Sequence, residues 1–313
     1  MGGRRQARRR GPLLRALLAV ALGVGVLTPT AVAGAAEPDP AAPTAAVAAP
    51  AGAPAASAGR INDFDCRPAD GRHPVVLLHG TFATWYEDLN FLQADLAARG
   101  WCTFSLTYGA HPEFPLVGGL KPVAESNVEI KEFVLRVAAA TGAAKVDVVG
   151  HSEGGLQALY LAKKQGIDNR LGRIVAIAPP THGTDAAGLI RLADRVIGRE
   201  TFDRIVAAVG VPVLSDEMPG GPAVVALNDG PVARPGIEYT VITSRYDEIV
   251  TPPETSFVRE PGVRNLYVQD SCPLDPVGHI GEAYDLNVWH LVRNALDPTR
   301  ARPILVCAVG SPG

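Results

Sequence analysis

The sequence predicts an α/β fold in which a mostly parallel central sheet carries helices on both faces. Strand patterns alternate with helix patterns along the chain, as expected for such a sheet. Residues 75–78 are four consecutive apolar residues, which is typical of a strand buried on both faces inside a parallel sheet. Residues 146–149 form a β-branched run that passes through a glycine-flanked turn into a helix-forming run.

The elements between these two strands follow in a regular order. Residues 102–106 form another predicted strand, and two helical patterns end at Gly100 and Gly142. The apolar faces of these helices consist of Leu89, Leu92 and Leu96 in the first, and of Ile130, Phe133, Val134 and Val137 in the second. The resulting order of strand, helix, strand, helix and strand supports the parallel sheet.

The turn after residues 146–149 carries a candidate nucleophile. It reads Gly150-His151-Ser152-Glu153-Gly154, with Ser152 at its apex. The two glycines allow the strand and the helix to cross closely, and the Glu153 N–H lies at a helix N-terminus, where a developing negative charge is stabilised. A bare Gly-x-Ser-x-Gly sequence can be an ordinary turn, but the strand before it and the helix after it favour a catalytic serine.

Two later loops supply candidates for an acid and a base. Asp247 follows the predicted strand at residues 238–243, and His279 follows the predicted strand at residues 265–268. A serine nucleophile needs a base that takes its proton and an anion that orients the imidazole. We therefore predict Ser152, Asp247 and His279 as a catalytic triad, in the chain order of nucleophile, acid and histidine.

Other histidines and acids were considered for the same roles. His79 and His151 adjoin tight turns and are interpreted as structural, whereas His182 is interpreted as lining a pocket. Surface or packing roles are expected for His73, His111 and His290. The alternative acids are Glu248, Asp275 and Asp185.

Four motifs, at residues 79–81, 150–154, 244–250 and 277–280, resemble those of secreted bacterial lipases of the α/β-hydrolase fold. The nearest group is the class 2 triacylglycerol lipases of actinobacteria, and the small lidless bacillus lipases are more distantly similar. The resemblance extends over residues 60–296 and rests on the order and spacing of the motifs. It implies a carboxylic ester hydrolase that needs no metal or organic cofactor.

The resemblance also implies an oxyanion hole made by the backbone N–H groups of Thr81 and Glu153. Thr81 directly follows His79-Gly80, and its hydroxyl is a candidate third donor. Glu153 departs from the family, because similar lipases more often carry Gln or Met after the nucleophile. A carboxylate there opposes the developing oxyanion unless it is paired or points away.

Residues 181–235 contain two amphipathic patterns that fit either helices packed on the sheet or a helical cap over an acyl groove. The apolar positions are Leu189, Leu192, Ala193, Val196 and Ile197 in the first, and Phe202, Ile205, Val206 and Val209 in the second. The run Pro219-Gly220-Gly221-Pro222 suits a flexible end of a cap. Phe82, Trp85 and Tyr86 are candidates for lining the same groove or filling the core.

Four cysteines favour two disulfides in an exported chain. The order along the chain suggests the pairs Cys66–Cys102 and Cys272–Cys307, although four cysteines allow three pairings. No Cys-x-x-Cys pair or histidine spacing accompanies them, so a metal site is not predicted.

The N-terminal sequence predicts export. Residues 1–36 contain six arginines and no acid, and their uncharged stretch at residues 16–27 is too short to span a membrane, so we interpret them as a signal peptide. Residues 37–59 are almost entirely Ala, Pro, Gly and Ser and are interpreted as a disordered tether before a catalytic domain at residues 60–313. Removing residues 1–36 leaves 23 basic residues against 32 acidic ones, a net charge of about −9, which argues against nucleic acid as a partner.

These observations predict a secreted, monomeric serine hydrolase that acts on acylglycerol esters, with a lipid or ester as its only partner and no stable membrane span. An esterase for short or polymeric esters is the alternative with the same triad. A peptidase and a non-catalytic binding protein with a hydrolase-like fold are further alternatives, and the complete triad argues against the last of these.

Overall fold

The structure is a computed structural model, and it describes residues 61–308. The predicted signal peptide at residues 1–36 and the predicted tether at residues 37–59 lie outside the described residues. None of the helices in the described range is long and apolar enough to cross a membrane.

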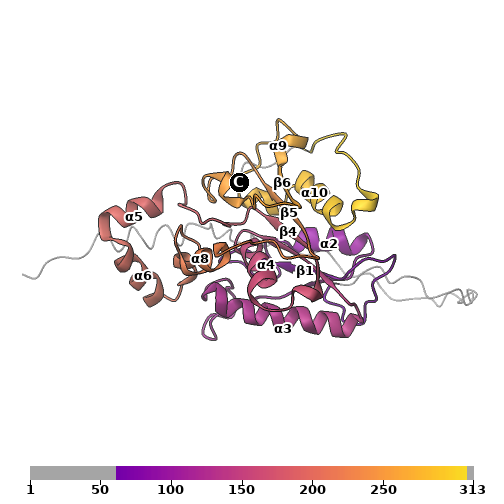
Figure 1. Cartoon of the computed structure of the whole chain (residues 1–313), viewed down its shortest axis with the longest axis horizontal. Helices are drawn as coiled ribbons and strands as arrows, with labels where there is room; N and C mark the ends of the chain where they lie inside the picture. The colour runs from indigo at the N-terminus through magenta and orange to yellow at the C-terminus, as the bar shows by residue number, and fades with distance from the viewer. Residues whose placement is uncertain (1–60, 309–313) are drawn as a thin grey trace, which may run out of the picture. The chain divides into compact units, whose positions relative to one another are not determined.

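A six-stranded parallel sheet with the strand order β2-β1-β3-β4-β5-β6 forms the centre of the fold (Figure 1). Its strands are β1 (Val75–Leu78), β2 (Thr103–Ser105), β3 (Val146–His151), β4 (Leu171–Ile177), β5 (Glu238–Thr243) and β6 (Val263–Tyr267). The strands β1 and β3 are buried along their whole length, as their apolar sequences predict. The predicted α/β class and the parallel sheet are confirmed.

Helices cover both faces of the sheet and enclose two apolar clusters. On one face, α3 (Val123–Thr141) and α4 (Glu153–Lys164) pack against side chains such as Val76 and Val148. On the other face, α2 (Asn90–Ala98) and α10 (Leu286–Leu296) pack against the strand residues next to these in the sequence, such as Val75 and Val149. This alternation follows from the period of two in a strand, which sends successive side chains to opposite faces.

The remaining elements are short. They comprise α7 (Val213–Asp216), α8 (Pro222–Asn228) and α9 (Val268–Ser271), and the 3-10 turns at Asp168–Arg170, Pro253–Ser256, Ile280–Ala283 and Pro298–Arg300. The last strand was predicted at residues 265–268, but β6 ends at Tyr267 because Val268 begins α9. The loop that carries His279 therefore starts from a helical turn and not directly from the strand.

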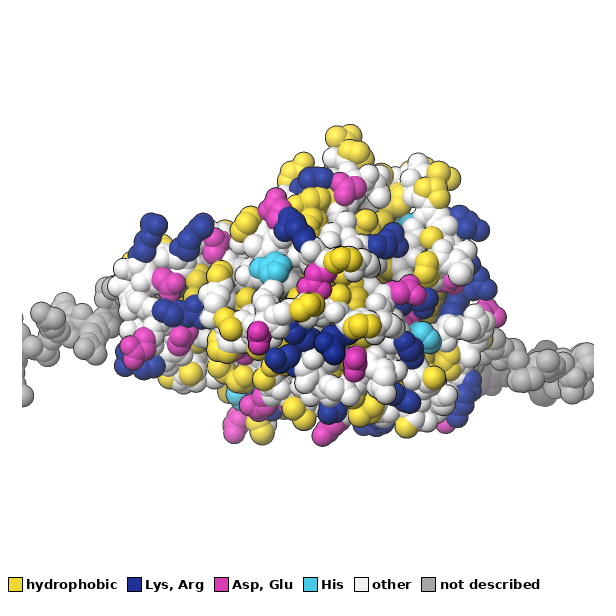
Figure 2. Space-filling view, viewed as in Figure 1, with side chains coloured by type: hydrophobic (Ala, Val, Ile, Leu, Met, Phe, Trp, Pro, Cys, Tyr) yellow, Lys and Arg dark blue, Asp and Glu magenta, His cyan; other side chains and the backbone are white. Residues whose placement is uncertain are grey.

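The two amphipathic patterns form α5 (Leu189–Ile197) and α6 (Arg199–Ala208), which lie beside each other and away from the sheet (Figure 1). No residue of α5 is buried, and α6 buries only Val206. Charged side chains cover much of the outer surface of this region that is visible in Figure 2. These helices therefore form an insertion that extends away from the sheet, and they do not pack on it as core helices would.

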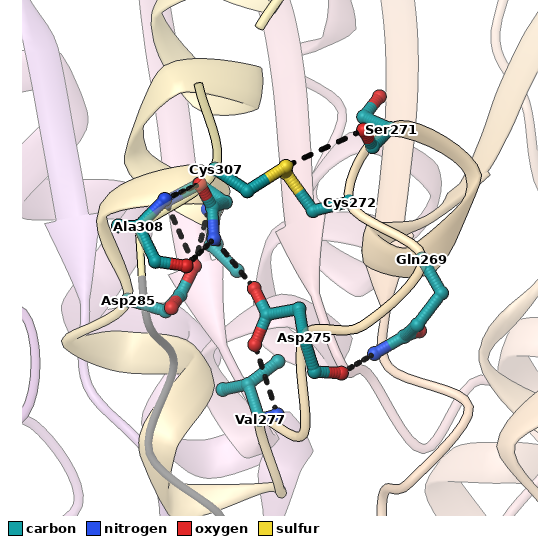
Figure 3. The surroundings of a disulfide bond; sticks show 10 residues. Gln269, Ser271, Cys272, Asp275, Val277, Asp285, Cys307 and Ala308 are labelled. Carbon is teal, nitrogen blue, oxygen red and sulfur yellow. Dashed lines mark hydrogen bonds between the residues drawn. A yellow bond between two sulfur atoms is a disulfide. The ribbon is translucent and has the colours of Figure 1, made fainter. Parts of the chain in front are cut away.

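Both disulfides link the pairs that the chain order suggests. Cys66 is bonded to Cys102, next to β2, and Cys272 is bonded to Cys307 near the C-terminal end of the described residues. Figure 3 shows that the second bond lies beside Asp275, whose backbone carbonyl accepts a hydrogen bond from Gln269. This disulfide therefore joins the last segment of the fold to the loop that leads toward His279.

Removing the first disulfide should destabilise the protein. The Cys66→Ser/Cys102→Ser variant opens a link with a sequence separation of 36 residues, and we expect a loss of about 3–4 kcal/mol in the free energy of unfolding. Urea denaturation followed by circular dichroism measures this change. Adding reductant should shift the midpoint of the wild type downward, and equal midpoints for variant and wild type would contradict a structural role of this bond.

Candidate active site

The turn between β3 and α4 holds Ser152 in an unusual backbone conformation. Its φ is 55° and its ψ is −123°, a region that non-glycine residues rarely adopt. A Cβ atom at Gly150 would collide with the carbonyl of Gly154, and one at Gly154 would collide with the backbone of Leu78. The two glycines therefore allow the close crossing that presents the Ser152 side chain at the sheet edge.

The structure brings the three predicted catalytic side chains together. His279 Nε2 lies 2.9 Å from Ser152 Oγ, and His279 Nδ1 lies 2.9 Å from Asp247 Oδ2. The imidazole and the carboxylate are buried, whereas the serine is partly exposed. The three side chains therefore form a continuous hydrogen-bonded chain, which is the arrangement that acyl transfer by a serine requires.

The backbone around Asp247 fixes its orientation. Its Oδ1 accepts hydrogen bonds from the N–H groups of Ile249 (2.9 Å) and Val250 (2.8 Å), which leaves Oδ2 for the imidazole. The neighbouring acid Glu248 accepts a hydrogen bond from the backbone N–H of His279 at 3.1 Å and so supports the loop and not the ring.

The other two alternative acids have structural partners. Asp275 accepts from the Val277 N–H and the Asn287 amide. Asp185 forms an ion pair with Arg191 and accepts from the Thr251 hydroxyl. Neither is the acid that contacts His279.

The two predicted oxyanion donors lie at the ends of different strands. Glu153 is the first residue of α4, so its N–H has no acceptor within the helix. Thr81 follows the end of β1, and within residues 61–308 its backbone N–H donates to no protein group. A Cβ built on the intervening Gly80 would lie 3.2 Å from Ser152 Cβ, so the end of β1 runs beside the serine.

The Glu153 side chain is fully buried and paired. It accepts hydrogen bonds from the Thr81 hydroxyl (3.0 Å) and the Gln157 amide (2.9 Å). Burial raises the pKa of the Glu153 carboxyl to about 7, although both hydrogen bonds oppose the rise. A second buried acid, Glu217, lies 3.4 Å from the same hydroxyl, and burial and the nearby Glu153 raise its pKa well above its ordinary value.

Asp88 links the end of β1 to the histidine that precedes Ser152. Its Oδ2 accepts from the Gly80 N–H at 2.6 Å, and its Oδ1 lies 2.8 Å from His151 Nδ1. The other ring nitrogen of His151 lies 3.0 Å from the carbonyl oxygen of His279. His151 is therefore a structural link between the turn and the histidine loop, as its position beside the turn suggests.

The remaining histidines bind backbone or side-chain partners away from Ser152 Oγ. His79 contacts the carbonyl of Gly80 and stacks on Tyr108. His182 was expected to line a pocket, but it is exposed and binds the carbonyl of Phe257. The partners of the other three are Asp147 for His73, the Gly210 carbonyl for His111 and the Arg302 carbonyl for His290.

Sequence reasoning missed three buried acids near the site, namely Asp88, Glu217 and Glu282. Glu282 accepts from the Ser244 N–H, and burial followed by the charge of Asp247 raises its pKa well above its ordinary value. The sequence carries no clear signal for the first two, because Asp88 directly follows Glu87 and Glu217 directly follows Asp216. Within residues 61–308, no group of three or more His, Cys, Asp or Glu residues is arranged to hold a metal ion.

The sheet and its nucleophile turn define an α/β hydrolase, and comparison with known proteins gives the same result. The sequence profile of the alpha/beta hydrolase family matches residues 75–308, and the chain belongs to this family.

The curated relatives include triacylglycerol lipases of Pseudarthrobacter phenanthrenivorans and Burkholderia plantarii. Each is 29% identical over 129 residues, which is 38% of this chain. The matched stretch covers 37% of the first relative and 33% of the second, or about a third of their lengths.

Solved structures share the fold at low sequence identity. Aspergillus fumigatus lipase B has a TM-score of 0.57 and 22% identity, covering 75% of this chain and 54% of that one. A structure from a study of LipS and LipT, two metagenome-derived lipolytic enzymes, has a TM-score of 0.52 and 16% identity, covering 74% of this chain and 94% of that one.

The Asp88 carboxylate should stabilise the fold in a pH-dependent way. Burial lowers the pKa of His151, but the Asp88 charge and hydrogen bond outweigh it, so the net pKa is raised. The stabilisation is then fully present below the ordinary histidine value of 6.5 and is lost as the pH rises through the folded-state pKa.

We therefore expect Asp88→Asn to lower the free energy of unfolding by about 3 kcal/mol at mildly acidic pH and by less at alkaline pH. Urea denaturation at the two pH values measures the difference. Asp194→Asn, at an exposed position of α5, is the control and should change neither value. A cost for Asp88→Asn that is the same at both pH values would argue against a charged His151.

Proposed function

We propose that this protein is a secreted serine hydrolase that cleaves the carboxylic ester bonds of acylglycerols. The observation that carries the proposal is the hydrogen-bonded chain from Ser152 Oγ through His279 to Asp247. The two free backbone N–H groups of Thr81 and Glu153 beside the serine supply the expected oxyanion hole.

In the first half of the reaction, Ser152 Oγ attacks the ester carbonyl carbon while its proton passes to His279 Nε2. Asp247 holds the imidazole tautomer and stabilises the imidazolium. The carbonyl oxygen becomes an oxyanion that the N–H groups of Thr81 and Glu153 bind. Collapse of this intermediate breaks the bond to the alcohol, which leaves with the proton from His279, and an acyl-Ser152 ester remains.

In the second half, a water molecule takes the place of the alcohol. His279 Nε2 accepts a proton from the water as its oxygen attacks the acyl carbon, and the same two N–H groups bind the second oxyanion. Breaking the bond to Ser152 Oγ returns the proton from His279 to the serine and releases the carboxylic acid. The cycle consumes one water and needs no redox partner.

Exposed apolar side chains near the oxyanion residues support a lipid substrate. Phe82, Trp85 and Tyr86 follow Thr81 and are exposed, so they do not fill the core. Their loop is joined to residues 114–118 by hydrogen bonds between Phe82 and Gly118 and between Gly118 and Ala83. The second loop adds Phe114 and Leu116, which are 69% and 83% exposed.

Apolar side chains also follow the acid and the base. Ile249 and Ile280 are 41% and 55% exposed. Ile249 lies two residues after Asp247, and Ile280 directly follows His279. Exposed apolar surface gathered around a site marks contact with a ligand, a membrane or another protein, and a lipid substrate meets this description. An esterase for short, soluble esters would not need it, so the observation favours the lipase over that alternative.

Two disulfides and the arginine-rich N-terminal sequence support export. Disulfides persist in oxidising compartments outside the cytosol, and the fold contains two of them. The relatives named triacylglycerol lipase are consistent with the proposed substrate class.

Substitution of the nucleophile should abolish activity. We expect Ser152→Ala to lower kcat/KM by at least about 10⁴-fold, because no other group can form the acyl-enzyme. The assay is hydrolysis of a series of acyl esters from short to long chains and of an emulsified triglyceride. Ser271→Ala, at an exposed serine of α9, is the matched control and should retain full activity.

The outcomes of this assay separate the alternatives. Loss of long-chain and emulsion activity in Ser152→Ala alone supports the proposal, whereas wild-type activity confined to short esters indicates an esterase. Failure of a covalent serine probe to label the native protein would overturn the enzyme function and favour a binding protein.

The exposed apolar side chains of the loop at residues 114–118 should affect hydrolysis only when the substrate is in a lipid phase. We expect Phe114→Ser/Leu116→Ser to lower hydrolysis of an emulsified triglyceride by about tenfold, since two exposed apolar side chains no longer enter the lipid. The rate on a soluble short-chain ester should be unchanged. Leu305→Ser/Val306→Ser removes two equally exposed apolar side chains elsewhere and is the control. An equal loss on both substrates would point to a folding defect or a role in catalysis.

A further inference from the structure

We propose that Glu153 and Glu217 share a proton beside the oxyanion hole, and that loss of this proton at alkaline pH slows ester hydrolysis. The inference rests on the proposed function, because it assigns these two side chains as positioning residues of the same site. They act through Thr81 and through their charge, and neither needs to touch the substrate.

The carboxyl groups of Glu153 and Glu217 both lie next to the hydroxyl of Thr81. The Thr81 hydroxyl lies 3.0 Å from Glu153 Oε2 and 3.4 Å from both carboxyl oxygens of Glu217. Both glutamates are buried, with exposures of 0% for Glu153 and 8% for Glu217. A Cβ atom on Gly119 would collide with Glu153 Oε2, so the backbone of the residue 114–119 loop covers the carboxyl directly.

The number of hydrogens available at Thr81 favours a shared proton. A threonine hydroxyl carries one hydrogen and can donate to only one carboxyl at a time, whereas an ionised carboxyl only accepts. With both glutamates ionised, one of the two contacts at Thr81 would join two acceptors without a hydrogen. A proton on one carboxyl lets it donate to the Thr81 oxygen, and the hydroxyl hydrogen is then free for the other carboxyl or for an oxyanion.

The surroundings offer little to neutralise two negative charges. The other groups that affect the pair are the Gln157 amide, which donates to Glu153, and Asp216 beside Glu217, which adds a carboxyl. Tyr108 is buried nearby, and burial followed by the charges of Glu153 and Glu217 raises its pKa well above its ordinary value. Among the described residues, no lysine or arginine contributes to the pKa of either glutamate.

The direction of the effect on catalysis follows from charge. The Glu153 N–H is one of the two proposed oxyanion donors, so its own side chain lies close to the developing negative charge. A neutral carboxyl has little effect there, but a buried carboxylate repels the oxyanion in a medium that screens poorly. Because burial raises the pKa of Glu153 to about 7, the pair should lose its proton on the alkaline side of neutrality, and activity should fall there.

The test compares the wild type with Glu153→Gln and Glu153→Gln/Glu217→Gln. Both variants keep the backbone N–H of residue 153 and a side chain of the same shape. The single variant removes the Glu153 carboxyl, and the double variant removes both carboxyls and so the titration of the pair. The measurement is kcat/KM for a soluble ester from about pH 6 to about pH 10. We expect the wild type to lose about tenfold between neutral pH and about pH 9, and the double variant to keep its activity over that range. Glu238→Gln, at an exposed glutamate, should reproduce the wild-type profile.

An infrared titration tests the shared proton without any activity. The carbonyl stretch of protonated carboxyl groups should include a component that disappears from the wild type between about pH 6 and about pH 9 and is absent from the double variant.

The two measurements test separate parts of the proposal. If kcat/KM falls equally at alkaline pH in the wild type and the double variant, the effect on hydrolysis is overturned. Identical infrared titrations would overturn the shared proton itself, even in a protein for which no ester substrate is found. If the double variant fails to fold, Glu153→Gln alone serves in the kinetic measurement. In the infrared titration its remaining Glu217 component should then disappear at a lower pH than in the wild type, because the charge of Glu153 no longer raises the Glu217 pKa. Absence of esterase activity in the wild type, with the infrared component present, would count against the proposed function and not against the pair.

Discussion

The close crossing of β3 and α4 is the constraint on which the rest of the site depends. It exists only because Gly150 and Gly154 have no side chains, and it holds Ser152 at a positive φ. Among residues 61–308, the N–H of the next residue has no acceptor. β3 lies in the middle of the sheet between β1 and β4. Since all six strands are parallel, the loops after β5 and β6 end at the same edge, where Asp247 and His279 reach the serine.

Much of this arrangement could be predicted from local sequence patterns. Buried parallel strands are nearly continuous apolar runs, and the order of the loops that follow them fixes which side chains meet at the sheet edge. Ser152, Asp247 and His279, which the structure brings together, could be chosen in this way because each lies in the connection after a strand that the pattern identifies. The end of β6 was placed one residue too late, because α9 continues the apolar pattern of the strand with Val268.

The buried acids could not be predicted, because their environment is created by distant parts of the chain. Glu217 directly follows the four-residue helix α7, 136 residues after Thr81 in the sequence, and no periodic pattern connects the two. Asp88 likewise reads as a surface residue in a loop, yet it holds the end of β1 and His151 together. Pairing across such separations depends on the tertiary fold, whereas periodicity reports only on which face of an element is buried.

The two ends of the insertion that contains α5 and α6 lie close together in the fold. The N–H of Thr184 donates to the carbonyl of Glu217 at 2.9 Å, and a Cβ atom on Gly183 would collide with the backbone of Pro219. Chain length between two such fixed ends can change without moving the sheet. Because only Val206 is buried in α5 and α6, residues 189–208 can be shortened, lengthened or replaced at little cost to the hydrophobic core.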